Sequence, residues 1–137
     1  PWENYWDRKT ASLVGRYQQT LDQQYFPYAR PQESGNKSDV RWARISNSSG
    51  SGIQFMVSDS LLNFEALPYS LDDLDPEVNK QQYHSGELVK RDTAFIHVDL
   101  QQLGLQGIDS WGSRPLEPYR IPFKEQQYSF WMLPVKK

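Results

Sequence analysis

The sequence predicts an all-β fold arranged as an antiparallel β-sandwich. Short runs rich in branched and aromatic residues alternate with turns rich in Gly, Asn, Ser and Pro, a pattern that is typical of sandwich folds. Aromatic residues make up 14% of the chain and charged residues 23%. We therefore expect a core built from a few large rings, most of them buried or half-buried in strands.

The N-terminal part of the chain predicts one helix between two loops. Pro1–Arg8 shows no apolar period and is expected to form an ordered loop. From Leu13 to Tyr25 the apolar residues recur at helical intervals, which predicts a helix. Pro27–Asp39 combines prolines, a glycine, an asparagine and serines, so it is expected to be a loop.

The central part predicts strands in quick succession. Val40–Ser46 is the first, and the flexible segment Asn47–Gly52 follows it. Gly52–Ser58 and Leu61–Leu67 are the next two, and the short turn between them predicts a hairpin.

A short helix and further strands are expected in the second half. Ser70 and Asp73 have the spacing of a capping box, which predicts a helix from Leu71 to Leu74, or across a proline as far as Gln81. The remaining strands are predicted at Glu87–Arg91, Thr93–Leu100, Pro118–Phe123 and Gln127–Leu133.

Composition excludes several classes of function. The formal net charge is -2 and no basic stripe is present, so nucleic acid is not an expected partner. No apolar run has the length of a membrane span. The chain has no cysteine, which excludes disulfides and thiolate metal sites. His84 and His97 are too few for a metal site unless carboxylates contribute, and neither is assigned a site.

Several motifs resemble one protein family. They are PWENYWDR (Pro1–Arg8), YARPQESGNKSDVRW (Tyr28–Trp42) and VDLQQLGLQGIDSWGSRPLEPYRI (Val98–Ile121), and the likeness continues into YSFWMLPV (Tyr128–Val135). In this order and spacing they resemble the C-terminal domain of the large bacterial β-galactosidases of glycoside hydrolase family 2. The resemblance covers nearly the whole chain.

The resemblance implies a specific architecture. In the family this domain is a two-sheet supersandwich related to aldose mutarotases, and it is considerably longer than this chain. Residues 1–137 are therefore expected to form a single β-sandwich domain or the C-terminal half of one. A half-sandwich would expose apolar area that normally meets the rest of the domain and the catalytic barrel. We expect self-association or an unpaired sheet edge as a result.

The resemblance also implies that the chain alone is inactive. Glycosidases need two carboxylates that flank the scissile bond, and no such pair is marked among Glu3, Glu33, Asp39 and Asp109. In the family both catalytic carboxylates lie on a separate (β/α) barrel, where the whole enzyme hydrolyses terminal β-D-galactosides such as lactose. Family members commonly use magnesium and sodium near that barrel. No ligand for either ion transfers to this chain, so no cofactor or metal is expected in it.

The main candidate for substrate contact is Trp111, together with Asp109 and Ser110. In the family the tryptophan of this D-S-W motif stacks on the leaving-group side of the substrate, because an aromatic face covers the C–H face of a pyranose and removes both from water. The alternative is a tryptophan packed on its own loop. Gln106 and Ile108 depart from the family's glycine-rich run, so we expect the loop and the aglycone preference to differ.

Polar residues of the first two motifs are candidates for the active-site entrance, for interdomain contact or for loop structure. They are Glu3, Asn4, Asp7, Arg8, Glu33, Asn36, Asp39 and Arg41. In the second motif the favoured interpretation is a hydrogen-bonded loop in which Asp39 or Glu33 pairs with Arg41, with Trp42 facing the core.

The sequence leaves three functions open: a domain that completes the substrate entrance of a β-galactosidase, a stand-alone carbohydrate-binding module, and a purely structural interdomain packing unit. The expected partners are the remaining domains of the parent glycosidase and a galactoside or its aglycone sugar, with no nucleic acid and no membrane. The compartment, cytoplasm or periplasm, is not specified by the residues.

Overall fold

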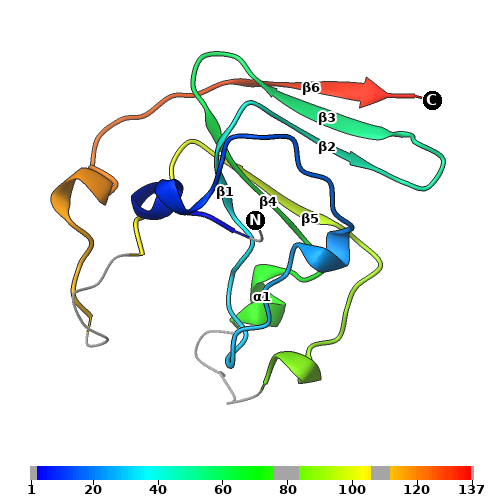
Figure 1. Cartoon of the computed structure of the whole chain (residues 1–137), viewed down its shortest axis with the longest axis horizontal. Coiled ribbons are helices and arrows are strands. Elements are labelled where there is room, and N and C mark those ends of the chain that lie inside the picture. The colour runs from blue at the N-terminus through cyan, green and yellow to red at the C-terminus, as the bar shows by residue number, and fades with distance from the viewer. Residues whose placement is uncertain (1–2, 76–83, 106–111, 137) are drawn as a thin grey trace.

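A computed structural model describes residues 3–75, 84–105 and 112–136 of the chain. In these ranges six strands form two three-stranded antiparallel sheets, and the connections carry short helical turns (Figure 1). The predicted all-β class with two antiparallel sheets is therefore confirmed. No helix in the same ranges combines the length and the apolar character needed to cross a membrane.

The first sheet has the order β1-β4-β5, with β1 at Lys37–Val40, β4 at Leu62–Leu67 and β5 at Phe95–Asp99. β4 is the central strand, and all of its residues except Phe64 are buried. In the antiparallel register of β4 and β5, Glu65 lies opposite His97, and the next pair on the same face joins Asn63 to Asp99. This register places polar side chains from distant parts of the sequence on one face of the sheet.

The second sheet has the order β2-β3-β6, with β2 at Trp42–Ser46, β3 at Gly52–Val57 and β6 at Phe130–Val135. A turn joins β2 to β3, and the Asn47 side-chain oxygen accepts hydrogen bonds from two backbone N–H groups within it. β6 pairs with β3 along its whole length, and Pro134 lies opposite Ile53.

The two sheets meet through aromatic rings. The ring of Phe55 in β3 lies 5.5 Å from that of Phe64 in β4 and 6.2 Å from that of Phe130 in β6. Phe55 is buried, as are Leu62 and Ala66 of the central strand. The predicted core of large rings is present at this contact.

Much of the second sheet is not covered. Its large apolar side chains with substantial exposure are Trp42, Ile53, Met56, Trp131, Met132 and Leu133. The register puts Trp42, Met56 and Trp131 in one row across the three strands, on the face opposite Phe55. The expectation that Trp42 faces the core is wrong, because the residue is 44% exposed with the Arg16 guanidinium over its ring.

Several predicted elements agree with the structure. The strands expected at Gly52–Ser58 and Leu61–Leu67 correspond to β3 and β4, and those expected at Thr93–Leu100 and Gln127–Leu133 overlap β5 and β6. Helix α1 spans Leu71–Leu74, and the Ser70 hydroxyl and Asp73 carboxylate cap it reciprocally. The extension of this helix to Gln81 lies outside the described residues.

The predicted strand Val40–Ser46 is divided between two sheets. β1 ends at Val40 and β2 begins at Trp42, so the chain passes from one sheet to the other at Arg41. The hairpin predicted between β3 and β4 is wrong for a related reason, because these strands belong to different sheets and β3 pairs with β2.

The predicted helix from Leu13 to Tyr25 is also wrong. The structure has 3-10 turns at Trp6–Ala11 and Leu21–Gln23 in this part of the chain. Leu13 and Val14 are 85% and 84% exposed. Because no surface buries the apolar side chains, the packing that stabilises most protein helices is missing.

Two predicted strands in the second half are wrong as well. In place of strands, Glu87–Arg91 and Pro118–Phe123 contain parts of 3-10 turns at Ser85–Glu87 and Glu117–Tyr119, followed by irregular backbone. Pro118 and Pro122 have no N–H to donate to a sheet, which disfavours a strand at the second segment.

Candidate functional site

Residues of the first two motifs gather over the outer face of the β1-β4-β5 sheet. The backbone N–H of Asn4 donates to the carbonyl of Asn36 at 2.8 Å, and the Asn36 side-chain amide donates to the carbonyl of Asn4 at 2.9 Å. The Asn4 side-chain oxygen accepts from the backbone N–H of Ser38 at 2.6 Å. These bonds hold the N-terminal segment against β1, so Asn4 and Asn36 serve the packing of this face.

Glu3 connects three parts of the chain in the same area. Its carboxylate accepts hydrogen bonds from the backbone N–H of Gly35 at 2.9 Å, from the Tyr5 hydroxyl at 3.1 Å and from the Tyr28 hydroxyl. Burial and the neighbouring Glu3 raise the pKa of Tyr28 to about 12 and also raise that of Tyr5. Both phenols therefore stay protonated and act as donors to Glu3 near neutral pH.

The loop before β1 approaches the segment around Gln24 very closely. Gly35 adopts φ +83°, and a Cβ at this position would lie 2.4 Å from the Gln24 carbonyl oxygen. Lys37, the first residue of β1, donates to the side-chain oxygen of Gln24 and to the Gly35 carbonyl, each at 2.5 Å. Burial lowers the pKa of Lys37 to about 8, and the carboxylates of Glu65 and Glu3 oppose this shift.

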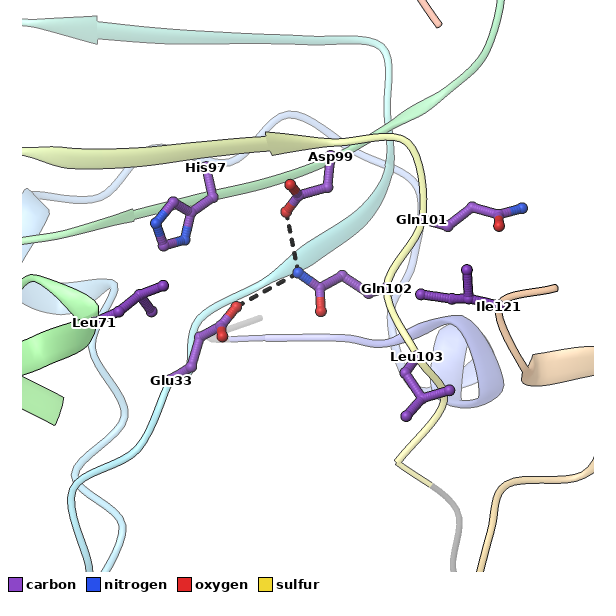
Figure 2. A pocket seen from close by; sticks show the side chains of 8 residues that line it. All are labelled: Glu33, Leu71, His97, Asp99, Gln101, Gln102, Leu103 and Ile121. Atoms are coloured by element: carbon purple, nitrogen blue, oxygen red, sulfur yellow. Dashed lines mark hydrogen bonds between the residues drawn. The ribbon is translucent and has the colours of Figure 1, made fainter. Parts of the chain in front are cut away.

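A shallow pocket of about 370 Å³ opens beside this network, as Figure 2 shows. Glu33, His97 and Asp99 line it, and the Gln102 amide donates to Asp99 at 3.1 Å and to Glu33 at 3.5 Å. Further lining side chains are Leu71, Gln101, Leu103 and Ile121. In Figure 2 Leu71 lies on the side of His97 and Glu33, and Leu103 and Ile121 lie at the other end of the pocket, so apolar side chains flank the polar ones.

Glu65 lies within the β4 strand next to the pocket. Its Oε1 is 3.3 Å from Nδ1 of His97, and the residue is 2% exposed. Burial raises the pKa of Glu65 to about 8, and the carboxylates of Glu33 and Asp99 add to the increase while Lys37 opposes it. One ligand atom from each of Glu33, Glu65 and His97 falls within 4.8 Å of the others.

This arrangement suits binding of a cation or sharing of a proton better than glycoside cleavage. Glycosidases place the scissile bond between two accessible carboxyl groups. Glu65 is buried and is not among the residues that line the pocket, so its carboxylate is not placed to flank a glycosidic bond together with that of Glu33.

The other predicted polar residues lie apart from the pocket. Asp39 has φ 59° and forms an ion pair with Lys9 at 2.8 Å. The expected pairing of Arg41 with Asp39 or Glu33 is wrong, since among the described contacts neither carboxylate bonds to it and the Arg41 side chain is exposed.

Asp7 and Arg8 belong to the 3-10 turn at Trp6–Ala11. The Asp7 carboxylate lies near Gly104, where an added Cβ would be 3.0 Å from its Oδ2. Arg8 is exposed, and its charge opposes the increase in the pKa of Tyr28.

The residues predicted to contact sugar, Asp109, Ser110 and Trp111, lie outside the described residues. The same is true of Gln106 and Ile108, which depart from the family motif. Their role stays a prediction from sequence.

Sequence reasoning missed Glu65 and His97 as partners. A glutamate flanked by Phe64 and Ala66 in the largely apolar run LNFEAL is a signal for a buried charge. No sequence pattern joins it to His97, because only the register of β4 and β5 brings the two together. The second histidine, His84, is exposed, and its Nδ1 lies 3.2 Å from the Ala29 carbonyl oxygen.

Comparison with known proteins gives a consistent result. Residues 1–132 match the family model described as "Beta galactosidase small chain". The chain is 38% identical over 122 residues to a beta-galactosidase of Priestia megaterium, with 88% of the chain covered. It is 34% identical over 129 residues to a beta-galactosidase of Pseudoalteromonas haloplanktis, with 94% covered, and 37% over 124 residues to beta-galactosidase BgaC of Bifidobacterium adolescentis, with 89% covered. The chain spans 11% of the length of each of these relatives.

Proposed function

We propose that this chain, which belongs to the beta-galactosidase small-chain family, is a non-catalytic domain of a beta-galactosidase. In this proposal the parent enzyme hydrolyses terminal β-D-galactosides with carboxylates on another domain. The chain packs against the other domains and completes the entrance to the active site. The match over residues 1–132 is the observation that carries this proposal.

The exposed apolar side chains of the β2-β3-β6 sheet support the packing role. Trp131 is 62% exposed and lies in one row with the exposed side chains of Trp42 and Met56, on the face opposite Phe55. Contiguous exposed apolar area on a folded protein usually marks a surface that another protein surface covers. The remaining domains of the parent are the proposed partner for this sheet.

Trp111 is the residue proposed to contact the sugar. The D-S-W motif supports this role through the resemblance described above, and the physical basis is the burial of an aromatic ring against the apolar face of a pyranose. The residue would position the aglycone, while bond cleavage takes place on the parent's catalytic domain.

An assay of activity in trans tests the packing role. The parent enzyme is produced without the residues of this chain, and hydrolysis of a nitrophenyl galactoside is measured before and after the chain is added. We expect the chain alone to be inactive, the shortened parent to be impaired, and the mixture to regain activity. Hydrolysis by the chain alone, or full activity of the shortened parent, would contradict the proposal.

Substitution of Trp111 in the full-length parent tests the sugar contact. Trp111→Ala is expected to raise KM for lactose roughly fivefold, since the lost stacking is worth about 1 kcal/mol, while Trp111→Phe retains most of the affinity. An unchanged KM in Trp111→Ala would exclude the contact. Saturable binding of lactose by the isolated chain, followed by tryptophan fluorescence, would instead favour a stand-alone carbohydrate-binding module.

A further inference from the structure

The outer face of the β1-β4-β5 sheet contains a buried carboxylate. Glu65 is 2% exposed, neither of its oxygens accepts a hydrogen bond of ordinary geometry within the described residues, and the carboxyl group of Glu33 lies near enough to share a proton with it. An unpaired buried carboxylate is strongly unfavourable unless a proton or a cation accompanies it. The Oε1 atom of Glu65 lies 3.3 Å from Nδ1 of His97. An imidazole nitrogen is a common metal ligand.

Three different parts of the fold bring metal-ligating atoms to this point. Glu65 comes from β4, His97 from the opposite position on β5, and Glu33 from the loop before β1. In Figure 2, Glu33 and His97 point toward the same space from opposite sides of the pocket. Their ligand atoms and that of Glu65 lie within 4.8 Å of one another.

The separation is close to that of a metal site. Ligand atoms about 2.1 Å from a tetrahedral ion lie about 3.4 Å from one another, so separations within 4.8 Å must shorten by at most about 1.4 Å. Glu33 is exposed and lies on a loop, which allows its side chain to supply this movement. Glu65 and His97 are already held by the pairing of their strands.

The charges around the cluster favour a cation. The carboxylates of Glu3 and Asp99 act in the same area, and the cation that opposes them is Lys37, whose Nζ is bound to Gln24 and Gly35. A metal ion would supply the positive charge that a carboxylate buried as deeply as Glu65 needs nearby. Gln102 bonds to both Glu33 and Asp99 and so orients the carboxylate of Glu33.

We propose that Glu33, Glu65 and His97 bind one divalent first-row transition-metal ion, with water in the positions that face the pocket. One imidazole nitrogen and two carboxylate oxygens suit Zn²⁺ and its neighbours better than Mg²⁺, which prefers oxygen ligands alone. The ion would fasten the Glu33 loop to the sheet. The inference depends on these contacts and not on the proposed function.

The alternative is a cluster that shares a proton and binds no metal. Titration of Zn²⁺ into the chelator-treated chain near neutral pH, followed by calorimetry, distinguishes the two. We expect one ion per chain, and we expect Glu65→Gln and His97→Asn each to weaken binding at least about tenfold. The matched control is His84→Asn, which removes the other histidine and should leave the affinity unchanged.

Thermal unfolding provides a second readout that also reports whether each variant is folded. A ligand that binds the folded state raises Tm, so Zn²⁺ should raise Tm of the unaltered chain and of His84→Asn but not of Glu65→Gln. This variant keeps the shape of the side chain and cannot ionise in the buried site, so it is expected to fold. Absence of saturable binding, equal binding by Glu65→Gln, or loss of binding in His84→Asn would each overturn the proposal.

Discussion

The two sheets of this chain differ in how much of their surface the chain itself covers. The outer face of β1-β4-β5 lies beneath the N-terminal segment and the loop before β1, and Tyr5, Ser34 and Asn36 are buried there. The β2-β3-β6 sheet instead exposes Trp131 and Met132. Short segments rich in Asn, Ser and Gly complete the first sheet through hydrogen bonds. The second sheet is also rich in large apolar side chains, but several of them are exposed. This suits the sheet to contact with another protein surface.

The largest difference in stability between the two sheets is expected when a leucine in each sheet is replaced by alanine. Leu67 in β4 is 1% exposed and Leu133 in β6 is 42% exposed. Leu67→Ala should lower the free energy of unfolding by about 2–5 kcal/mol, because it leaves a cavity in a packed site. Leu133→Ala should lower it by less than about 1 kcal/mol. Urea unfolding at low protein concentration, followed by circular dichroism, checks this, and equal losses would show that both sheets are covered in solution.

The covered sheet should also show a pH dependence that originates at Glu65. Its pKa rises from an ordinary value of 4.5 to about 8 in the fold, so the folded chain binds more protons than the unfolded chain between these values. The contribution of Glu65 to stability is therefore fully present below about pH 4.5 and is lost as the pH rises through about 8. The groups that face Glu65 are Glu33, His97, Asp99 and Lys37.

Glu65→Gln should remove most of this slope and make the chain more stable than the original at pH 8. The expected difference is on the order of 2–4 kcal/mol, measured by urea unfolding across the pH range with a chelator present. Glu125→Gln is the control, because Glu125 is exposed and distant in sequence from the cluster. Parallel pH profiles for the original chain and Glu65→Gln would contradict the assignment.

A smaller effect is expected at the loop that covers the first sheet. Gly35→Ala places a Cβ at a positive φ and close to the Gln24 carbonyl oxygen, so we expect a loss of about 2 kcal/mol of stability. Gly86→Ala is the matched control, since open space surrounds that position and a change within about 0.5 kcal/mol is expected. Thermal unfolding of the two variants decides whether the close approach exists in solution.

The smallest effect on stability is expected on the open sheet, where the readout is self-association. Trp131→Ser should change the free energy of unfolding by less than about 1 kcal/mol while it increases the monomer fraction in sedimentation velocity. Burial of the exposed apolar row between two copies is the reason to expect association of the original chain. Leu116→Ser, at an exposed position outside the sheets, should leave association unchanged. A chain that stays monomeric at every concentration would contradict this expectation.

Local patterns predicted the elements whose stability is local. The short run Gly52–Ser58 between turn residues identified β3, and the spacing of Ser70 and Asp73 identified the cap of α1, because short strands and capping bonds depend on neighbours in sequence. The helical spacing of Leu13 and Val14 was misleading, since no surface covers these side chains.

Features that depend on tertiary pairing were not predictable in this way. A short turn after β3 favoured a hairpin, yet β4 enters the other sheet because its Phe64 packs against Phe55 across the core. The pairing of Glu65 with His97 is fixed by strand register between distant segments. The proposed sugar-binding residues around Trp111 depend on family resemblance alone, because they lie outside the described part of the chain.

Pro134 has a consequence for how the open sheet meets its surroundings. It lies within β6, an edge strand, opposite Ile53. Proline offers no amide hydrogen, and within a sheet it is tolerated at an edge where that hydrogen would point outward. A foreign strand that tried to extend the sheet beyond β6 would therefore find its hydrogen-bond ladder interrupted. At this edge the sheet therefore resists growth into a larger sheet or a fibril. Its apolar faces stay available, so association is expected to occur through packing of side chains.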